Sequence, residues 1–132
     1  MWTILLGIFF ILHGLVHLLY AGQSGRAFEL RPGMTWPDGS WLFSKLLSDE
    51  ITRSLVVVLL VLAALGYVVS GLGLFLHQSW WRLVVTWTAV FSSVIFLLFW
   101  DGKFQALADK GGVGILINLA ILVVVLVLKW PA

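Results

Sequence analysis

Cysteine is absent from the chain, and charged residues are scarce. None of the 132 residues is a cysteine, which excludes disulfides, thiolate metal sites and thiol–disulfide chemistry. Any redox role therefore requires a bound cofactor. Charged residues make up only 11% of the chain, and the eight basic ones are scattered among six acidic ones. This scatter argues against nucleic-acid binding and against a polybasic patch for anionic lipids.

Hydrophobic residues take the place of the missing charge. They make up 61% of the chain and give it a mean hydropathy of +1.08, which an ordinary water-soluble domain does not reach. The apolar runs are continuous, as in 55–62, and this favours helices over barrel strands, which alternate apolar and polar residues. The chain length leaves room for four spans and no separate soluble module. We therefore expect an all-α membrane protein, folded as an antiparallel four-helix transmembrane bundle in the lipid bilayer.

The expected spans form a single membrane domain of residues 1–132, with spans at 2–21, 51–76, 80–100 and 113–128. The first is not expected to be a cleavable signal peptide, because it lacks a basic beginning and its apolar stretch is too long. Residues 77–79 make a very short turn, so the second and third spans are neighbours. The long polar connection, 22–50, is expected to contain a short interfacial helix, 41–47, at the membrane surface.

Two histidines are the most informative polar residues of the first span. His13 and His17 lie four residues apart, so their imidazoles share one helical face. An ionisable side chain at membrane depth is costly unless it is neutral, paired or next to water, and it marks a candidate functional site. Gly7, Gly14 and Ala21 recur every seven residues beside this face and predict a close helix contact. We therefore expect both imidazoles to point into the bundle.

Polar residues of other spans lie at a similar depth. The ends of the first and third spans and the starts of the second and fourth must share one membrane face, here called the loop face. His17, Ser93 and Asn118 lie about 5 to 10 Å inside this face, at roughly 1.5 Å per helical residue. The sequence thus predicts a polar ligand-binding pocket that opens to the loop face. Its predicted residues are His13, His17, Tyr20, Ser93, Trp100, Asp101 and Asn118.

Two interpretations of these polar residues stay open. In one, Asn118 and the two histidines satisfy each other through interhelical hydrogen bonds that only fix the packing. In the other, they bind a ligand. The spacing of His13 and His17 suits two metal ligands on one helix, but Gly14 stands where zinc hydrolases have a glutamate. Because a metal site needs three or four convergent ligands, we predict none.

Redox cofactors are a second class of ligand. Haem held by two histidines needs them on opposite sides of the ring, yet His77, the remaining histidine, is predicted at the far membrane face. One axial histidine, or a ligand from a partner, stays open. A quinone is held more simply, since a neutral histidine and a tyrosine or asparagine can donate to its two carbonyls. Hydrolysis by Ser92 or Ser93 with His17 as base lacks an orienting acid, so no catalytic residue is predicted.

Two stretches give the chain a resemblance to a known family. His13-Gly14 breaks the first span with a small and a polar residue, and a glycine-rich polar turn, 109–114, leads to Asn118-Leu119 in the last span. With four short spans, this pattern resembles the DoxX-like family of small bacterial and archaeal membrane proteins. The resemblance covers the whole chain in hydropathy and only these stretches in residues. It implies a four-helix bundle and, for some members, association with respiratory or quinone-linked complexes.

Charge predicts the orientation. Two basic residues lie at the face opposite the loop face, namely Arg82 and Lys129. Six lie at the loop face: Arg26, Arg31, Lys45, Arg53, Lys103 and Lys110. The positive-inside rule then places the longer loops in the cytoplasm and the termini outside the cell membrane.

For function, we expect a non-catalytic membrane protein whose pocket binds an amphipathic small molecule, a partner subunit or a second copy. The alternative is a redox subunit that uses His13 and His17 on quinone or haem. The two differ in that only the redox subunit requires a cofactor that purifies with the protein.

Overall fold

The computed structural model describes residues 1–105 and 107–131, which form four α-helices and no strand. The helices are α1 (Trp2–Ser24), α2 (Asp49–Phe75), α3 (Trp81–Leu98) and α4 (Gly112–Leu122), and α4 continues as a π-helical turn, Val123–Val127. Short 3₁₀ turns occupy Phe43–Lys45 and Leu107–Lys110. α1, α2 and α3 are long and apolar enough to cross a membrane, and Gly112–Val127 is a shorter apolar helix.

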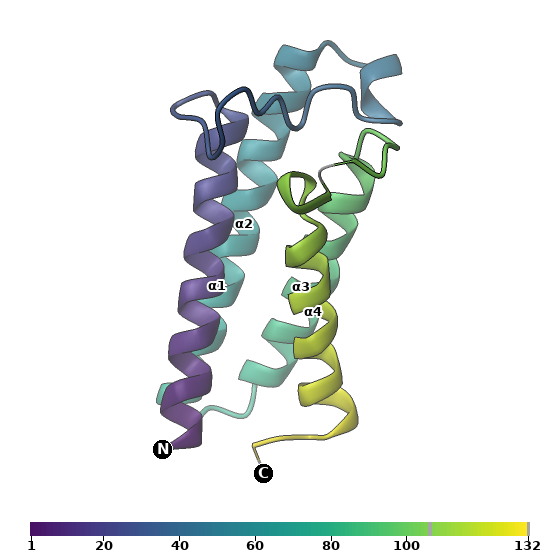
Figure 1. Cartoon of the computed structure of the whole chain (residues 1–132). Coiled ribbons are helices and arrows are strands. Elements are labelled where there is room, and N and C mark those ends of the chain that lie inside the picture. Colours follow the sequence, from purple (N-terminus) through teal and green to yellow (C-terminus); the bar gives the residue numbers. More distant parts are fainter. Residues whose placement is uncertain (106, 132) are drawn as a thin grey trace.

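The helices stand side by side (Figure 1). α1 packs along α2, α2 along α3, and α3 along α4. Both chain termini and the turn between α2 and α3 lie at one end of the molecule, and segments 25–48 and 99–105 lie at the other end, here called the loop end. The connection after α1 and the segment after α3, which the sequence assigns to the loop face, thus share one end of the structure.

Local sequence explains where two of the helices begin. Ser48 caps α2, because its hydroxyl accepts a hydrogen bond from the backbone nitrogen of Ile51 at 3.2 Å. Asp49 and Glu50 follow in the first turn, where negative charge is favoured by the helix dipole. α4 begins after Gly111, whose φ of 87° is strained for any residue with a Cβ.

The predicted close contact along the first span is confirmed. Gly7, Gly14 and Ala21 are all buried. A Cβ on Gly14 would lie 3.0 Å from the backbone oxygen of Ala64 in α2, and a Cβ on Gly71 would lie 2.7 Å from the backbone oxygen of Gly7. The two backbones can approach this closely only because the crossing points lack side chains.

Gly71→Ala is expected to lower the free energy of unfolding by about 1 to 3 kcal/mol, because the new methyl group meets a backbone carbonyl that cannot rotate away. Gly25→Ala is the control, since a Cβ there would meet Val57 at 3.4 Å, an ordinary contact. Unfolding by SDS in mixed micelles measures both. Equal stability of the two variants would contradict the close contact at Gly71.

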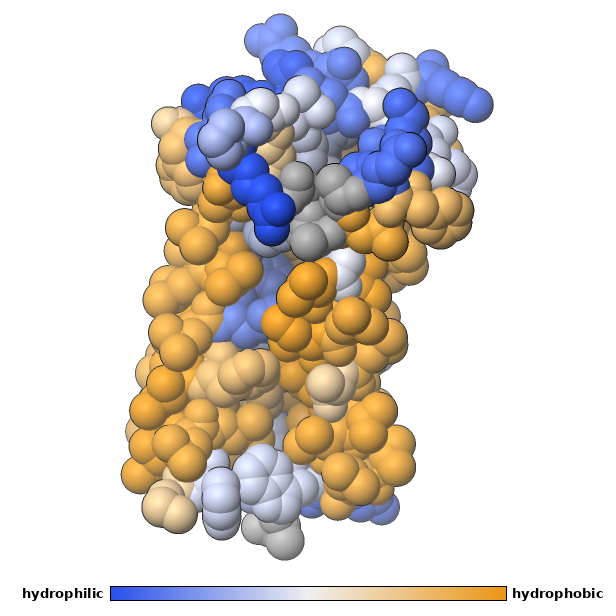
Figure 2. Space-filling view, viewed as in Figure 1, coloured by the Kyte–Doolittle hydropathy of each residue, from blue (hydrophilic) through white to orange (hydrophobic). Residues whose placement is uncertain are grey.

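The outer surface of the helices is apolar. Figure 2 shows apolar side chains covering the helices, with polar surface gathered at the loop end. A water-soluble monomer rarely exposes a continuous apolar surface of this extent. The protein is therefore membrane-like in both its helices and its surface. Exposed apolar side chains from all four helices include Ile4, Leu12, Val58, Leu65, Trp87, Leu97, Leu116 and Val127.

Residues 41–47 contain one 3₁₀ turn, Phe43–Lys45, where the sequence predicts a short helix. The hydroxyl of Ser40 and the indole of Trp41 each donate, at 2.7 Å, to a carbonyl in the last turn of α3. The backbone nitrogen of Trp41 also donates to the oxygen of Trp100 at 2.8 Å. These bonds tie the segment to the last turn of α3 and to the residues that follow it.

Candidate functional site

A cluster of polar side chains lies in the middle of the four helices and is here called the polar centre. Ser93 is half-buried, and the other members are almost completely buried. Every helix contributes at least one member, so the cluster ties the whole bundle together. The members are His13 and His17 from α1, Tyr67 from α2, Ser92 and Ser93 from α3, and Asn118 from α4.

The backbone oxygen of His13 determines the proton positions in this cluster. It lies 2.8 Å from Nδ1 of His17 and can only accept, so Nδ1 of His17 carries the proton. Nε2 of His17 then accepts from the hydroxyl of Ser92 at 2.6 Å. Because the Ser92 proton is used there, its oxygen accepts from Nδ2 of Asn118 at 3.0 Å.

Asn118 links the remaining members. Its Nδ2 also donates to Ser93 at 3.1 Å, and Ser93 donates within its own helix to the oxygen of Ala89 at 2.9 Å. Its Oδ1 accepts from the hydroxyl of Tyr67 and, at 2.9 Å, from Nε2 of His13. His13 therefore carries its proton on Nε2, and its Nδ1 has a free lone pair.

Nδ1 of His13 is the one ring nitrogen of the polar centre without a hydrogen bond from any described residue. In the described part of the chain, two side-chain atoms have no hydrogen-bond partner and no contact with open space, namely Nε1 of Trp36 and Oγ1 of Thr86. Nδ1 of His13 is not one of these enclosed atoms, so it borders open space. A cavity of about 80 Å³ lies beside this ring and is lined by His13 and His17.

The cavity opens between α1 and α4. Val16 and Val113 lie on its wall and are themselves exposed on the outer surface, so the opening faces sideways. Figure 2 shows polar surface in the hollow between these two helices, with apolar surface on both sides. The complete lining is His13, Val16, His17, Tyr20, Phe96, Val113, Gly114 and Ile117.

An aromatic cluster stands between this cavity and the loop end. The rings of Tyr20, Trp36 and Phe96 contact one another with centroids 5.5 to 5.7 Å apart. Tyr20 and Phe96 line the cavity, and Trp36 comes from the long connection above them. The sequence predicts the opening of the pocket on the side where these three rings lie.

The structure brings some predicted site residues together and separates others. His13, His17, Ser93 and Asn118 share the polar centre, and Tyr20 lines the cavity. The indole of Trp100 instead donates to the backbone oxygen of Lys103 at 2.8 Å. Asp101 pairs with Lys110 at 3.0 Å and lines a separate cavity of about 260 Å³ at the loop end. Trp100 and Asp101 are therefore not part of the site beside the histidines.

Tyr67 and Ser92 belong to the site but are missing from the predicted set. Ser92 has the same sequence signal as Ser93, a hydroxyl in an apolar span, and the helical register decides which of the two faces His17. Tyr67 carries the one phenol in the predicted span 51–76. A phenol hydroxyl in the apolar middle of a span is the signal that points to it.

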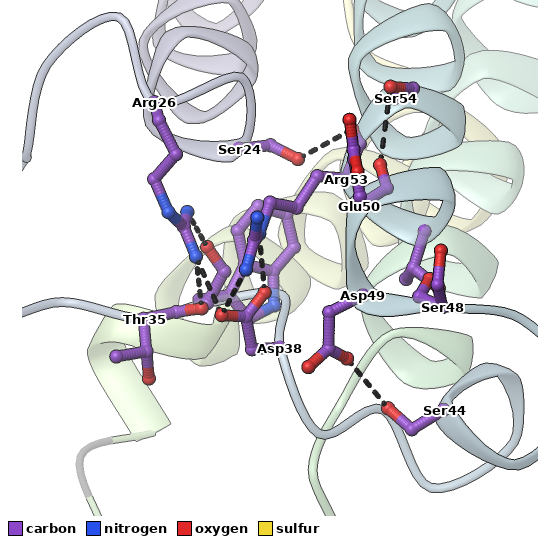
Figure 3. A network of polar contacts seen from close by, with 12 residues as sticks. Ser24, Arg26, Thr35, Asp38, Ser44, Ser48, Asp49, Glu50, Arg53 and Ser54 are labelled. Atoms are coloured by element: carbon purple, nitrogen blue, oxygen red, sulfur yellow. Dashed lines mark hydrogen bonds and ion pairs between the residues drawn. The ribbon is translucent and has the colours of Figure 1, made fainter.

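A second polar cluster, here called the Asp38 latch, holds the loop end together. Asp38 accepts from Arg53 at 2.7 and 2.9 Å and pairs with Arg26 at 3.0 Å. Figure 3 shows both arginines directed at this one carboxylate. Partial burial alone would raise the pKa of Asp38, but the Arg53 hydrogen bonds and the charges of Arg26 and Arg53 hold it below its ordinary value. The latch joins the connection after α1 to the first turns of α2.

Comparison of the chain with protein-family models, curated proteins and solved structures gives no significant match. The resemblance to the DoxX-like family therefore remains a prediction. The polar centre and the cavity beside it are the features that bear on function.

Proposed function

We propose that this chain is a small membrane protein that binds the polar head of an amphipathic molecule, which enters from the bilayer between α1 and α4. One observation carries this proposal: Nδ1 of His13, the ring nitrogen of the polar centre that no described residue pairs, belongs to a side chain that lines a cavity beside the apolar outer surface. An unpaired polar atom at membrane depth is costly. A ligand head that pairs with it removes this cost, and the ligand tail can lie along the apolar helices.

The arrangement favours binding over hydrolysis. Ser92 and His17 are hydrogen-bonded as a nucleophile and its base would be, but a backbone carbonyl occupies the position of the orienting acid. The oxygen of Ser92 also accepts from Asn118 and is fully buried. We therefore propose a non-catalytic role.

We further propose that the chain crosses the cell membrane four times as an antiparallel bundle. Residues 112–127 form the shortest span, which local thinning of the bilayer can accommodate. Trp2 and Trp130 contact each other edge to face at the end with the termini, where aromatic residues anchor a span. The basic residues of the loop end favour a cytoplasmic location for that end, with residues 41–47 at the membrane surface.

A redox subunit of the DoxX-like kind remains the alternative. The cavity has about half the ~150 Å³ that accommodates a benzene ring, so a quinone ring would require α1 and α4 to move apart. Haem would need an axial ligand from a partner, because His77 follows α2 at the end with the termini. In a further alternative, a partner subunit or a second copy of the chain covers the groove between α1 and α4. Measuring the oligomeric state in mild detergent tests this alternative.

Gly114→Leu is expected to abolish ligand retention while the protein stays folded. A Cβ at this position would meet Phe96 at 3.4 Å, an ordinary contact, so a side chain is accepted and its further atoms fill the cavity. Mass spectrometry of lipids that purify with the protein in nanodiscs measures the loss. Gly114→Ala is the matched control and is expected to keep the ligand. Equal retention by Gly114→Leu and the wild type would show that the ligand binds elsewhere.

A further inference from the structure

The hydrogen-bonding character of the binding atom is determined by the rest of the polar centre. The proton of His13 lies on Nε2 because Oδ1 of Asn118 accepts there at 2.9 Å. Moving that proton to Nδ1 would leave two lone pairs facing each other at this distance. Nδ1 of His13 is therefore presented to the cavity as an acceptor.

A rotated Asn118 amide does not reverse this assignment. Rotation would turn the amide oxygen toward Ser92, whose only proton is donated to His17. Two oxygens without a shared proton would then lie 3.0 Å apart. The amide orientation in the structure is the one in which every hydrogen of the polar centre has an acceptor.

The cavity also restricts the size and charge of the head. Its volume of about 80 Å³ is about half of the ~150 Å³ that holds a benzene ring. Apart from the two histidines and Tyr20, the described lining is glycine and apolar side chains, with no lysine, arginine or carboxylate. A phosphate, carboxylate or ammonium head would enter this space without a counter-charge, which is unfavourable.

From these three observations we infer that the ligand head is a single neutral hydroxyl, which donates its proton to Nδ1 of His13. The ligand is then a long-chain membrane alcohol, held with its tail against the exposed groove between α1 and α4. A carbonyl head has the same size but no proton to donate. This inference rests on the proposed function and adds the chemical class of the ligand.

The test is a competition experiment on the full chain in phosphatidylcholine nanodiscs. A hexadecan-1-ol that carries a diazirine in its tail is photo-crosslinked to the protein, and the labelled residues are mapped by mass spectrometry. The unlabelled competitors are hexadecan-1-ol, 1-fluorohexadecane and hexadecanal, which share the chain length and differ in the head. Because all competitors act on the wild-type protein, the result does not depend on the folding of a His13 variant.

We expect labelling near Val16 and Val113, and displacement by hexadecan-1-ol at a membrane fraction roughly three- to tenfold lower than by the fluoride, as one added hydrogen bond predicts. Hexadecanal should compete no better than the fluoride. Equal competition by the alcohol and the fluoride, or stronger competition by the aldehyde, would overturn the hydroxyl inference and leave the binding site in place. Labelling of the wild type no greater than that of Gly114→Leu would instead overturn the proposed function.

Discussion

Asn118→Leu is expected to lower the free energy of unfolding by about 2 to 4 kcal/mol, because it leaves two buried donors without an acceptor. These donors are Nε2 of His13 and the hydroxyl of Tyr67, which both bond to Oδ1 of Asn118. Both groups are buried, and neither bonds to another acceptor among the described residues. Unfolding by SDS in mixed micelles measures the loss.

Two further variants separate this effect from a change in α4 itself. Leu116→Ala changes an exposed side chain on the outer face of the same helix and should cost less than about 0.5 kcal/mol. Ser93→Ala removes one of the two acceptors of Asn118 Nδ2 and should cost at most about 1 kcal/mol. If Asn118→Leu were as stable as Leu116→Ala, the polar centre would not hold the helices together.

Asp38→Ala is expected to lower the free energy of unfolding by about 1 to 3 kcal/mol, because Arg26 and Arg53 then face each other without the carboxylate between them. The value lies between those for surface and buried ion pairs, since all three side chains are partly exposed. In an Arg53→Met background the cost should fall, because one of the two positive charges is gone. An unchanged cost in that background would contradict the latch.

The Asp38 latch also predicts how stability depends on pH. The folded protein holds the pKa of Asp38 below its ordinary value, so the stabilisation is complete above about pH 4 and is lost as the pH falls through the lower, folded-state pKa. Asp38→Asn should lack this part of the acid destabilisation. Unfolding curves of both proteins between about pH 3 and 6 measure the difference. Identical slopes would mean that Asp38 is not paired in the folded state.

Much of the helical arrangement follows from the sequence, because apolar runs and helical periodicity determine it. Each helix begins and ends within three residues of the expected span, if the π-helical turn is counted with α4. Counting depth from the loop face placed His17 and Asn118 at similar levels, and both belong to the polar centre. The hydrogen bond of His13 with Asn118 is one of the interhelical bonds that the packing interpretation predicts.

The rest depends on geometry that a sequence does not specify. Whether Tyr67 or a neighbour faces α1 depends on the rotation of α2, which is set where Gly71 crosses Gly7. In the latch, Asp38 pairs with Arg26, twelve residues earlier, and with Arg53, fifteen residues later. The turns of the long connection determine where these three side chains come together. The contacts of Trp36 with Tyr20 and Phe96 beside the cavity depend on the path of the long connection.

The most direct test of the central claim is the ¹⁵N NMR spectrum of the His13 ring in nanodiscs, with and without hexadecan-1-ol. The structure predicts a protonated Nε2 and an unprotonated Nδ1, while His17 shows the opposite pattern. It also predicts that the Nδ1 signal of His13 shifts when the alcohol is added and stays in place with 1-fluorohexadecane. A His13 protonated on Nδ1, or an Nδ1 signal that ignores the alcohol, would contradict a free acceptor that binds a hydroxyl from the membrane.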